Sequence, residues 1–307
     1  MGTYVESKII TLTSQSATQK RNGDFLSNVY YELGLFIKDE PDIIHKQITL
    51  QSAQIPYSFY VINYTNNQFK YQLGTGPIFT STIPPGNYNG NSLITALKTA
   101  LTANGITLTI SLSSINGKLT FTHASSNFTF YDLTYSILPT LGFLENTNIT
   151  STTFTLTASF SLNLLGIKVL QVRSSILNTL NYSSIHGGIT TLIQSISVSA
   201  VPFGMIDYTD TGNNKITFTN GSLDELDIEI LDGENGEFIN FNNQDWTMTL
   251  CIYLTRLIEP RARIPNFFVG DTIPKSQSNS SEPIKQDIKE KQENKDIQEL
   301  NFLADNL

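Results

Sequence analysis

Residues Leu223–Leu231 read LDELDIEIL, an alternation of carboxylate and aliphatic side chains. Successive side chains of a β-strand point to opposite faces of the sheet, so this pattern predicts a strand with one solvated and one buried face. The carboxylates then face water, and Leu226, Ile228 and Ile230 face a core. A turn sequence, DGENG, separates this strand from an apolar run at Asp245–Leu254. We expect the two runs to form the last pair of strands.

Short runs of the same kind recur along the chain. They are rich in β-branched and aromatic residues, and turn-forming residues separate them. Asn116-Gly117 stands between two alternating runs and is a strong hairpin signal. About eight to ten such strands indicate an all-β sandwich or jelly roll. The other expected strands are 9–12, 28–37, 46–55, 57–64, 107–112, 118–123, 153–160, 166–172, 190–201 and 213–219.

One segment interrupts the strands. Residues 91–101 place Leu93, Leu97 and Leu101 on one side of a helix, and Gly105 follows its end. The helix and the hairpin after it form a small α+β subdomain inserted into the β-rich chain. The expected parts are the first part of the β domain at 1–64, the insertion subdomain at 65–150, the second part of the β domain at 151–260, and a flexible tail at 261–307.

The tail differs in composition from the rest of the chain. Residues 276–294 are rich in Ser, Gln, Lys and Glu, and such a segment buries too little apolar area to offset its ordering entropy. Apolar residues return at helical spacing near the end. This end is either frayed, or a short amphipathic helix that docks on a neighbouring subunit through a tether. The apolar residues concerned are Ile297, Leu300, Phe302, Leu303, Ala304 and Leu307.

The charge balance argues against a nucleic-acid-binding protein. Charged residues make up 15% of the chain, and the net charge is −8. A surface that binds nucleic acid needs a basic footprint, so we expect nucleic acid to be no main partner. The basic residues that cluster are Arg261 and Arg263, with Arg256 nearby. They could contact DNA or an acidic neighbour, or they could serve solubility alone.

No combination of residues indicates catalysis. His45, His123 and His186 are scattered, and none has a second ligand at metal spacing. Cys251 stands in an apolar run, which predicts a small buried core residue rather than a nucleophile. We expect no enzymatic activity, no metal and no cofactor. The chain also shows neither a signal-peptide pattern nor an apolar run long enough to span a membrane.

The one dense charged cluster is acidic and lies between residues 224 and 237. Paired carboxylates for glycoside hydrolysis, a calcium loop and a weak ion site at a subunit interface are alternatives to the solvated face of a strand. The alternation of acidic and aliphatic residues favours the solvated face. The members are Asp224, Glu225, Asp227, Glu229, Asp232, Glu234 and Glu237.

Three sets of passages, taken in order, resemble a known family. They are similar to the minor capsid (penton) proteins of virophages, polintons and related viruses of the double-jelly-roll capsid lineage. The resemblance covers roughly residues 5 to 255. The passages are 26–33 and 48–63, then 83–88 with the helix after it, 117–121 and 141–143, and finally 226–236 and 242–250.

The resemblance implies a single jelly roll and a structural role. Five copies would form the vertex of an icosahedral capsid and contact the major capsid protein, with other minor capsid proteins and a host receptor as further partners. The protein would reside in the virion after assembly in the host cytoplasm. The tail would act as a strap. The residues expected to contact partners are Arg256, Arg261, Arg263, Leu300, Phe302 and Leu303.

A second function stays open, because jelly rolls also serve as lectins. The chain could be a glycan- or receptor-binding module, alone or combined with the vertex role. Exposed aromatic residues gathered on one loop face would favour this alternative. The candidates are Tyr88, Tyr131 and Tyr135.

Overall fold

A computed structural model describes residues 2–179, 181–183, 188–212 and 214–258. These residues build two hydrophobic cores, one in a β-sandwich and one in the inserted segment. The sandwich has eight main strands. In chain order they are β1 (Gly2–Thr13), β3 (Asn28–Ile37), β4 (Ile43–Pro56), β12 (Val169–Arg173), β15 (Leu192–Ser197), β16 (Met205–Thr209), β18 (Leu223–Asp232) and β19 (Thr247–Ile258).

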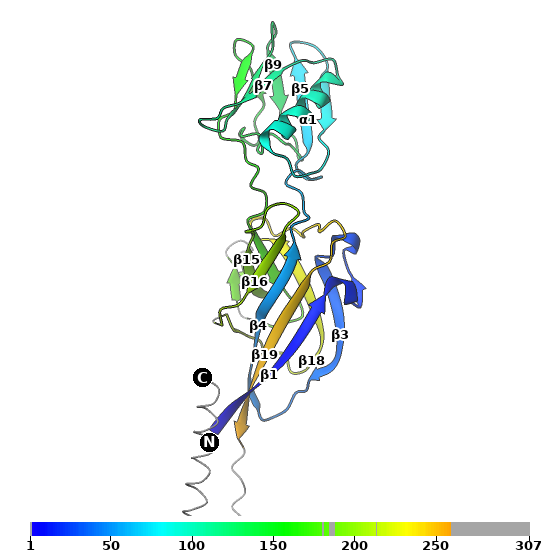
Figure 1. Ribbon diagram of the computed structural model, residues 1–307, viewed down its shortest axis with the longest axis vertical. Coiled ribbons are helices and arrows are strands. Elements are labelled where there is room, and N and C mark those ends of the chain that lie inside the picture. Colours follow the sequence, from blue (N-terminus) through cyan, green and yellow to red (C-terminus); the bar gives the residue numbers. More distant parts are fainter. Residues whose placement is uncertain (1, 180, 184–187, 213, 259–307) are drawn as a thin grey trace, which may run out of the picture. The chain divides into compact units, whose positions relative to one another are not determined.

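The eight strands form two antiparallel sheets (Figure 1). One sheet has the order β1-β19-β4-β16, and the short β17 (Ile216–Thr217) also pairs with β4. The other has the order β15-β12-β18-β3-β2, where β2 is Gln19–Lys20. Numbered one to eight along the chain, the strands run 1-8-3-6 in the first sheet and 2-7-4-5, written from its β3 end, in the second. This is the topology of a single jelly roll, and it confirms the predicted fold class.

The last two strands do not pair with each other, contrary to expectation. β18 pairs with β12 and β3, whereas β19 pairs with β1 and β4 in the opposite sheet. The chain between them crosses from one sheet to the other. The sequence pattern identified both strands but could not identify their partners, because alternation defines a buried face and not a neighbour.

The core of the sandwich fills the space between the two sheets. Leu226, Ile228 and Ile230 of β18 are fully buried, as predicted. Trp246 closes one end of the core, where its indole Nε1 donates a hydrogen bond to the carbonyl oxygen of Leu26 over 2.7 Å. Buried aromatic and aliphatic side chains from both sheets therefore hold the sandwich together.

The segment between β4 and β12 folds around its own core. Its helix, α1 (Gly90–Thr102), begins at Asn89, whose side chain accepts a hydrogen bond from the backbone N–H of Ser92 in a capping box. Leu93, Leu97 and Leu101 are buried, as the helical spacing predicted. The strands are β5 (Gln68–Leu73), β6 (Ile78–Thr82), β7 (Thr109–Leu112), β8 (Leu119–Thr122), β9 (Phe128–Tyr131), β10 (Ile149–Thr150) and β11 (Thr155–Thr157).

The insertion contains two small sheets. One has the order β10-β9-β5-β6, and the other has the order β11-β8-β7. The hairpin signalled by Asn116-Gly117 is present as β7 and β8, which pair antiparallel. Elsewhere in the chain, three-residue elements are η1 (Ser14–Ser16), η2 (Gly23–Phe25), β13 (Asn181–Ser183) and β14 (Gly188–Thr190).

The insertion is longer than the sequence predicted. Its core includes residues from Ile62 to Leu164, and β11 pairs with β8. Residues 151–164, which we assigned to the second part of the jelly roll, therefore belong to the insertion. The strand expected at 57–64 is wrong, because these residues form no strand ladder. Tyr57 and Phe59 in this segment pack into the jelly-roll core. β5, β9 and β16 were not predicted.

No helix among the described residues is long and apolar enough to cross a membrane. The expected tail, residues 261–307, lies outside the described part of the chain.

Candidate functional site

One candidate surface lies at the end of the jelly roll where β1 begins and β19 ends. Arg256 of β19 is 9% exposed and forms three ion pairs with its own chain. Its Nε lies 2.7 Å from Glu6, and its Nη1 lies 2.5 Å from Glu40 and 2.8 Å from Asp42. The hydrogen bonds that Arg256 donates to Asp42, Glu40 and Glu6 raise its pKa above the ordinary value. We predicted that Arg256 contacts a partner, but the structure shows it holding β1 to the connection between β3 and β4.

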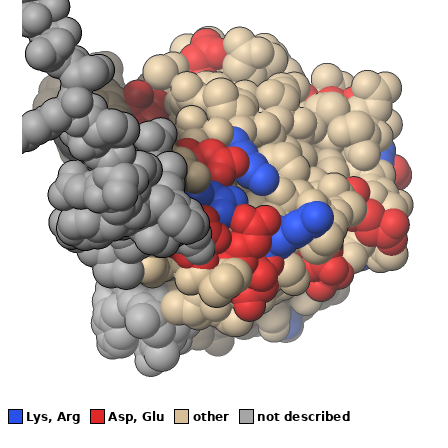
Figure 2. All heavy atoms as spheres, turned by 90° about the horizontal axis from the view of Figure 1, so that it is seen from below, with Lys and Arg blue, Asp and Glu red and all other residues tan. Residues whose placement is uncertain are grey.

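A second buried cation stands beside this cluster. Lys46 Nζ lies 3.3 Å from Asp39, donates to the carbonyl oxygen of Asn220 over 2.8 Å, and also donates to that of Gly221. Seen from below, basic and acidic side chains lie side by side on this end (Figure 2). The end is therefore an ordered, charged surface. Of the other predicted contact residues, Arg261, Arg263, Leu300, Phe302 and Leu303 lie outside the described residues.

The acidic cluster includes a buried carboxylate. Asp227 is fully buried, although the alternation predicted a solvated position. Ser174 Oγ donates to it over 2.6 Å, the backbone N–H of Ile176 donates over 3.1 Å, and the hydroxyl of Ser175 donates as well. Arg21 Nη1 lies 3.5 Å from the same carboxylate. Asp227 therefore anchors the loop after β12 to the sheet. This role depends on donors in residues 174–176, which are far from Asp227 in the sequence.

The other acidic residues are spread along β18 and the turn after it. Asp224 and Glu225 are exposed, and burial raises the pKa of Glu229 and of Asp232. Among the described residues, no group of three or more His, Cys, Asp or Glu could hold a metal ion. His45 lies on the surface, where its Nε2 is 3.3 Å from the hydroxyl oxygen of Thr217.

The first outer face is the outward side of β1, β19 and β4. Residues opposite one another there include Ile9, Cys251 and Thr49, because their neighbours Ile10 and Leu250 point into the core. Cys251 is buried, as predicted. Most other side chains on this face are Thr, Ser or Gln. It is thus uncharged over much of its area, with Val5 and Ile9 each 60% exposed.

The second outer face is the outward side of β3, β18 and β12, and it is rich in carboxylates. Glu32 lies opposite Glu225, and Glu229 lies opposite Arg173. Tyr30 donates a hydrogen bond to Glu225, which with burial raises the pKa of the Tyr30 phenol to about 12. The two outer faces of the sandwich therefore differ in chemistry.

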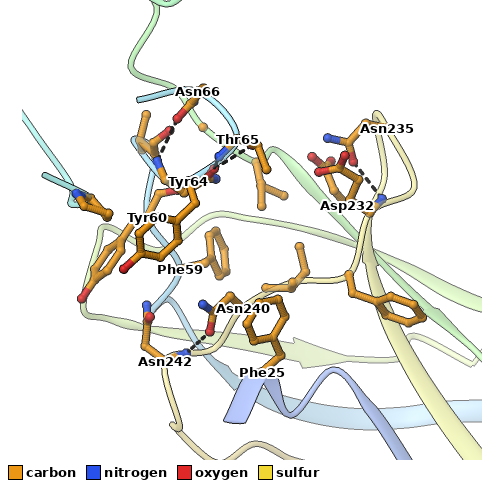
Figure 3. Close-up of a pocket in the computed structure, with 18 of the residues that line it drawn as sticks. Phe25, Phe59, Tyr60, Tyr64, Thr65, Asn66, Asp232, Asn235, Asn240 and Asn242 are labelled. Carbon is orange, nitrogen blue, oxygen red and sulfur yellow. Dashed lines mark hydrogen bonds between the residues drawn. The ribbon is translucent and has the colours of Figure 1, made fainter. Parts of the chain in front are cut away.

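A pocket of about 350 Å³ lies where the segments that connect the insertion leave the jelly roll (Figure 3). Its wall is formed by residues 59–66, 163–167 and 232–242, with Phe25 from the chain before β3. Aromatic rings, asparagine amides and two carboxylates line it, and none of the described residues in the lining is Lys, Arg or His. Sequence reasoning missed this pocket, because its walls come together only in the folded chain.

The three tyrosines proposed for a glycan site do not line the pocket. Tyr88 donates to the carbonyl oxygen of Pro84 over 2.7 Å, and Tyr131 donates to Gln72 over 2.5 Å. Tyr135 is 46% exposed. A usable sequence signal for the pocket was the set of asparagines in 63–67 and 240–243 beside exposed aromatic residues.

The comparisons with known proteins find a likeness among solved structures. A scan against models of protein families finds no match, and a search of curated proteins finds none. Among solved structures, the selenomethionine-labelled mavirus penton protein matches with a TM-score of 0.47 and 12% identity. The match covers 82% of this chain and 100% of that chain. Neither the identity nor the TM-score assigns the chain to a family.

Proposed function

We propose that this chain is a structural capsid protein that forms the pentameric vertex of an icosahedral particle and contacts the major capsid protein. The observation that carries the proposal is a single jelly roll with an insertion between its third and fourth strands. Jelly rolls are recurrent capsid domains. The passages that resemble penton proteins coincide with β3, β4, β18 and β19 of the jelly roll and with the insertion.

The difference between the two outer faces supports assembly into a ring. A closed ring of identical subunits needs a heterologous interface, in which one patch of each subunit meets a different patch of the next. The first outer face offers hydroxyl and amide groups with exposed Val5 and Ile9, whereas the second offers carboxylates and Tyr30. Hydroxyls and amides can donate hydrogen bonds to carboxylates across such an interface.

The tail would extend these contacts. In this proposal Arg261 and Arg263 pair with acidic groups of a neighbouring subunit or of the major capsid protein, and Leu300, Phe302 and Leu303 bury apolar surface there. The protein acts in the virion after assembly in the host cytoplasm, without catalysis or a cofactor. Its net charge of −8 disfavours packaged DNA as the main partner.

Analytical ultracentrifugation of the full chain, alone and mixed with the major capsid protein of the same virus, tests the proposal. We expect a pentamer or a stable complex with the capsid protein. Ile9→Arg should abolish the pentamer, because it places a charge on the first outer face. Ile115→Arg is the matched control, since Ile115 is 95% exposed on the hairpin loop between β7 and β8. A monomer that ignores the capsid protein would contradict the proposal.

A further inference from the structure

We propose that the pocket formed by residues 59–66, 163–167 and 232–242 with Phe25 is a binding site for a neutral saccharide of one or two rings. Its volume of about 350 Å³ lies at the lower end of the usual range for small-molecule sites. This inference is independent of the vertex role, because it concerns a different part of the molecule from the two outer faces.

The walls of the pocket are fixed before any ligand binds. Ser58 Oγ donates to the carbonyl oxygen of Phe241 over 2.6 Å, and Asn242 Nδ2 donates to that of Ser58 over 2.5 Å. Phe59 stacks on Tyr57, with ring centroids 4.4 Å apart. These contacts tie the segment that leaves β4 to the chain between β18 and β19. A preformed site loses less conformational entropy when it binds.

The second connecting segment closes against the first at Gly166. Its φ is +62°, in the left-handed region. A Cβ atom there would lie 2.9 Å from Val61 Cγ2 and 3.5 Å from the hydroxyl of Tyr57. Only glycine permits this backbone approach, and so the two connecting segments form a continuous wall.

Exposed aromatic rings provide the apolar part of the site. Tyr64 is 74% exposed, Phe25 is 42% exposed and Phe238 is 40% exposed, and all three line the pocket. Large apolar side chains that gather in the open mark a binding surface. An aromatic ring offers a flat, electron-rich face, and the C–H groups on one side of a pyranose ring match it in size and polarity.

The asparagines of the pocket offer donors in defined orientations. The side-chain oxygen of Asn240 accepts from the backbone N–H of Asn242 over 2.8 Å, and that of Asn235 accepts from Glu237 over 2.9 Å. Asn163 accepts from Leu165 over 3.2 Å in the same way. Each oxygen is thereby engaged, while the three NH₂ groups have no hydrogen-bond partner among the described residues. Free NH₂ groups can donate to hydroxyl oxygens.

Two carboxylates also line the pocket and disfavour the binding of anions. Asp232 Oδ1 accepts from the backbone N–H of Glu234 over 2.9 Å, and Glu237 also lines the pocket. Carboxylates accept hydrogen bonds from sugar hydroxyls. With two acidic groups and no basic group in the lining, a phosphate, a sulfate or an acidic sugar would be repelled. A neutral polyol with one apolar face fits this combination of groups.

Saturation-transfer NMR on the full-length protein tests the proposal, with cellobiose, lactose, maltose and mannobiose as probes. We expect at least one of them to bind with a dissociation constant of about 1 mM. Tyr64→Ala should weaken binding about tenfold by removing an exposed stacking surface. Asn240→Ala should weaken it too. Tyr135→Ala is the matched control, because Tyr135 is an exposed tyrosine outside the pocket.

Three results would overturn the proposal. They are no saturation transfer from the protein to any of the four sugars, equal transfer from Tyr64→Ala and from the unchanged protein, and loss of sugar binding in Tyr135→Ala. Thermal unfolding of Tyr64→Ala should match that of the unchanged protein, since the side chain is mostly in solvent. A pentamer that binds no sugar would refute this site alone, and a monomer that ignores the capsid protein but binds sugar would refute the vertex role alone.

Discussion

The jelly roll and the insertion reach stable folds by different routes. The longest strands of the jelly roll are β1 with 12 residues, β4 with 14 and β19 with 12, and the pairing of β1 with β19 joins Gly2 to Ile258. The strands of the insertion have two to six residues, and its core forms within one contiguous segment from Ile62 to Leu164. The jelly roll therefore depends on contacts between residues far apart in the sequence, and the insertion depends on contacts within one segment.

The side chains that pack the core of the insertion include contacting aromatic rings. Aliphatic side chains are the majority in both cores, and the insertion also contains a cluster of aromatic rings in contact with one another. Phe130 lies 4.9 Å from Phe69, 5.0 Å from Phe121 and 5.7 Å from Phe143, measured between ring centroids. Local contacts cost less loop-closure entropy than distant ones. We therefore expect the insertion to fold faster and to unfold separately.

The largest effect should come from Trp246→Ala in the jelly roll. Trp246 is 1% exposed and hydrogen-bonds to Leu26, so the change leaves a cavity and an unpaired carbonyl. We expect the free energy of unfolding of the jelly roll to fall by about 4 kcal/mol. Urea unfolding followed by circular dichroism should show one transition shifted and a second, from the insertion, unchanged. A single transition that shifts as a whole would contradict separate unfolding.

Phe130→Ala should give the converse result. Phe130 is fully buried among aromatic rings of the insertion. Its removal should lower the free energy of unfolding of the insertion by about 3 kcal/mol. The intrinsic fluorescence of Trp246, which reports the jelly roll, should keep its midpoint in urea. A fall in the urea midpoints of both the insertion and the jelly roll would show that the two cores form one cooperative unit.

Asp227→Asn should have an intermediate effect, confined to the jelly roll. The amide cannot accept from Ser174, Ser175 and Ile176 as a carboxylate does, and it loses the charge that faces Arg21. We expect a loss of about 2 kcal/mol in the free energy of unfolding, measured in urea. Asp224→Asn is the control, because Asp224 is exposed on the same strand. Equal losses in the two variants would refute the anchoring role of Asp227.

The smallest effect concerns pH and the second outer face. The hydrogen bond to Glu225, followed by burial, raises the pKa of Tyr30 from 10.0 to about 12. The fold favours the neutral phenol. The contribution of Tyr30 to the free energy of unfolding is therefore complete below pH 10.0, the pKa of the phenol in the unfolded chain. It is lost as the pH rises to about 12, the pKa of the phenol in the folded chain. Several tyrosines have a raised pKa, so absorbance titration of Tyr30→Phe should show one late-ionising phenolate fewer than the unchanged protein, and in Glu225→Gln one phenolate should ionise earlier. A late phenolate unchanged in both variants would exclude this assignment.

Much of the fold could be predicted from local pattern. The strand at 28–37 and the helix near 91–101 follow the periods of buried side chains, and the hairpin after the helix follows from Asn116-Gly117. These features depend on neighbours within a few residues, so the sequence displays them directly. The all-β class follows from them as well.

The candidate site could be predicted less well. The contact of Arg256 with a partner stays a prediction, and the ion pairs of Arg256 with Glu6, Glu40 and Asp42 of its own chain were not predicted. Asp227 was placed in solvent on alternation alone. In both cases the deciding partner comes from a distant part of the chain, and no local pattern encodes it.

The sequence by itself determined where the helix and the long strands β3, β4, β18 and β19 lie, and that the chain is mostly β. Only the tertiary structure decided that β18 and β19 belong to opposite sheets, that β11 joins the insertion, and that segments 59–66, 163–167 and 232–242 enclose a pocket. The physical reason is the period of two in a strand. It defines which face of each strand is buried, whereas the choice of neighbour depends on the packing of the whole core.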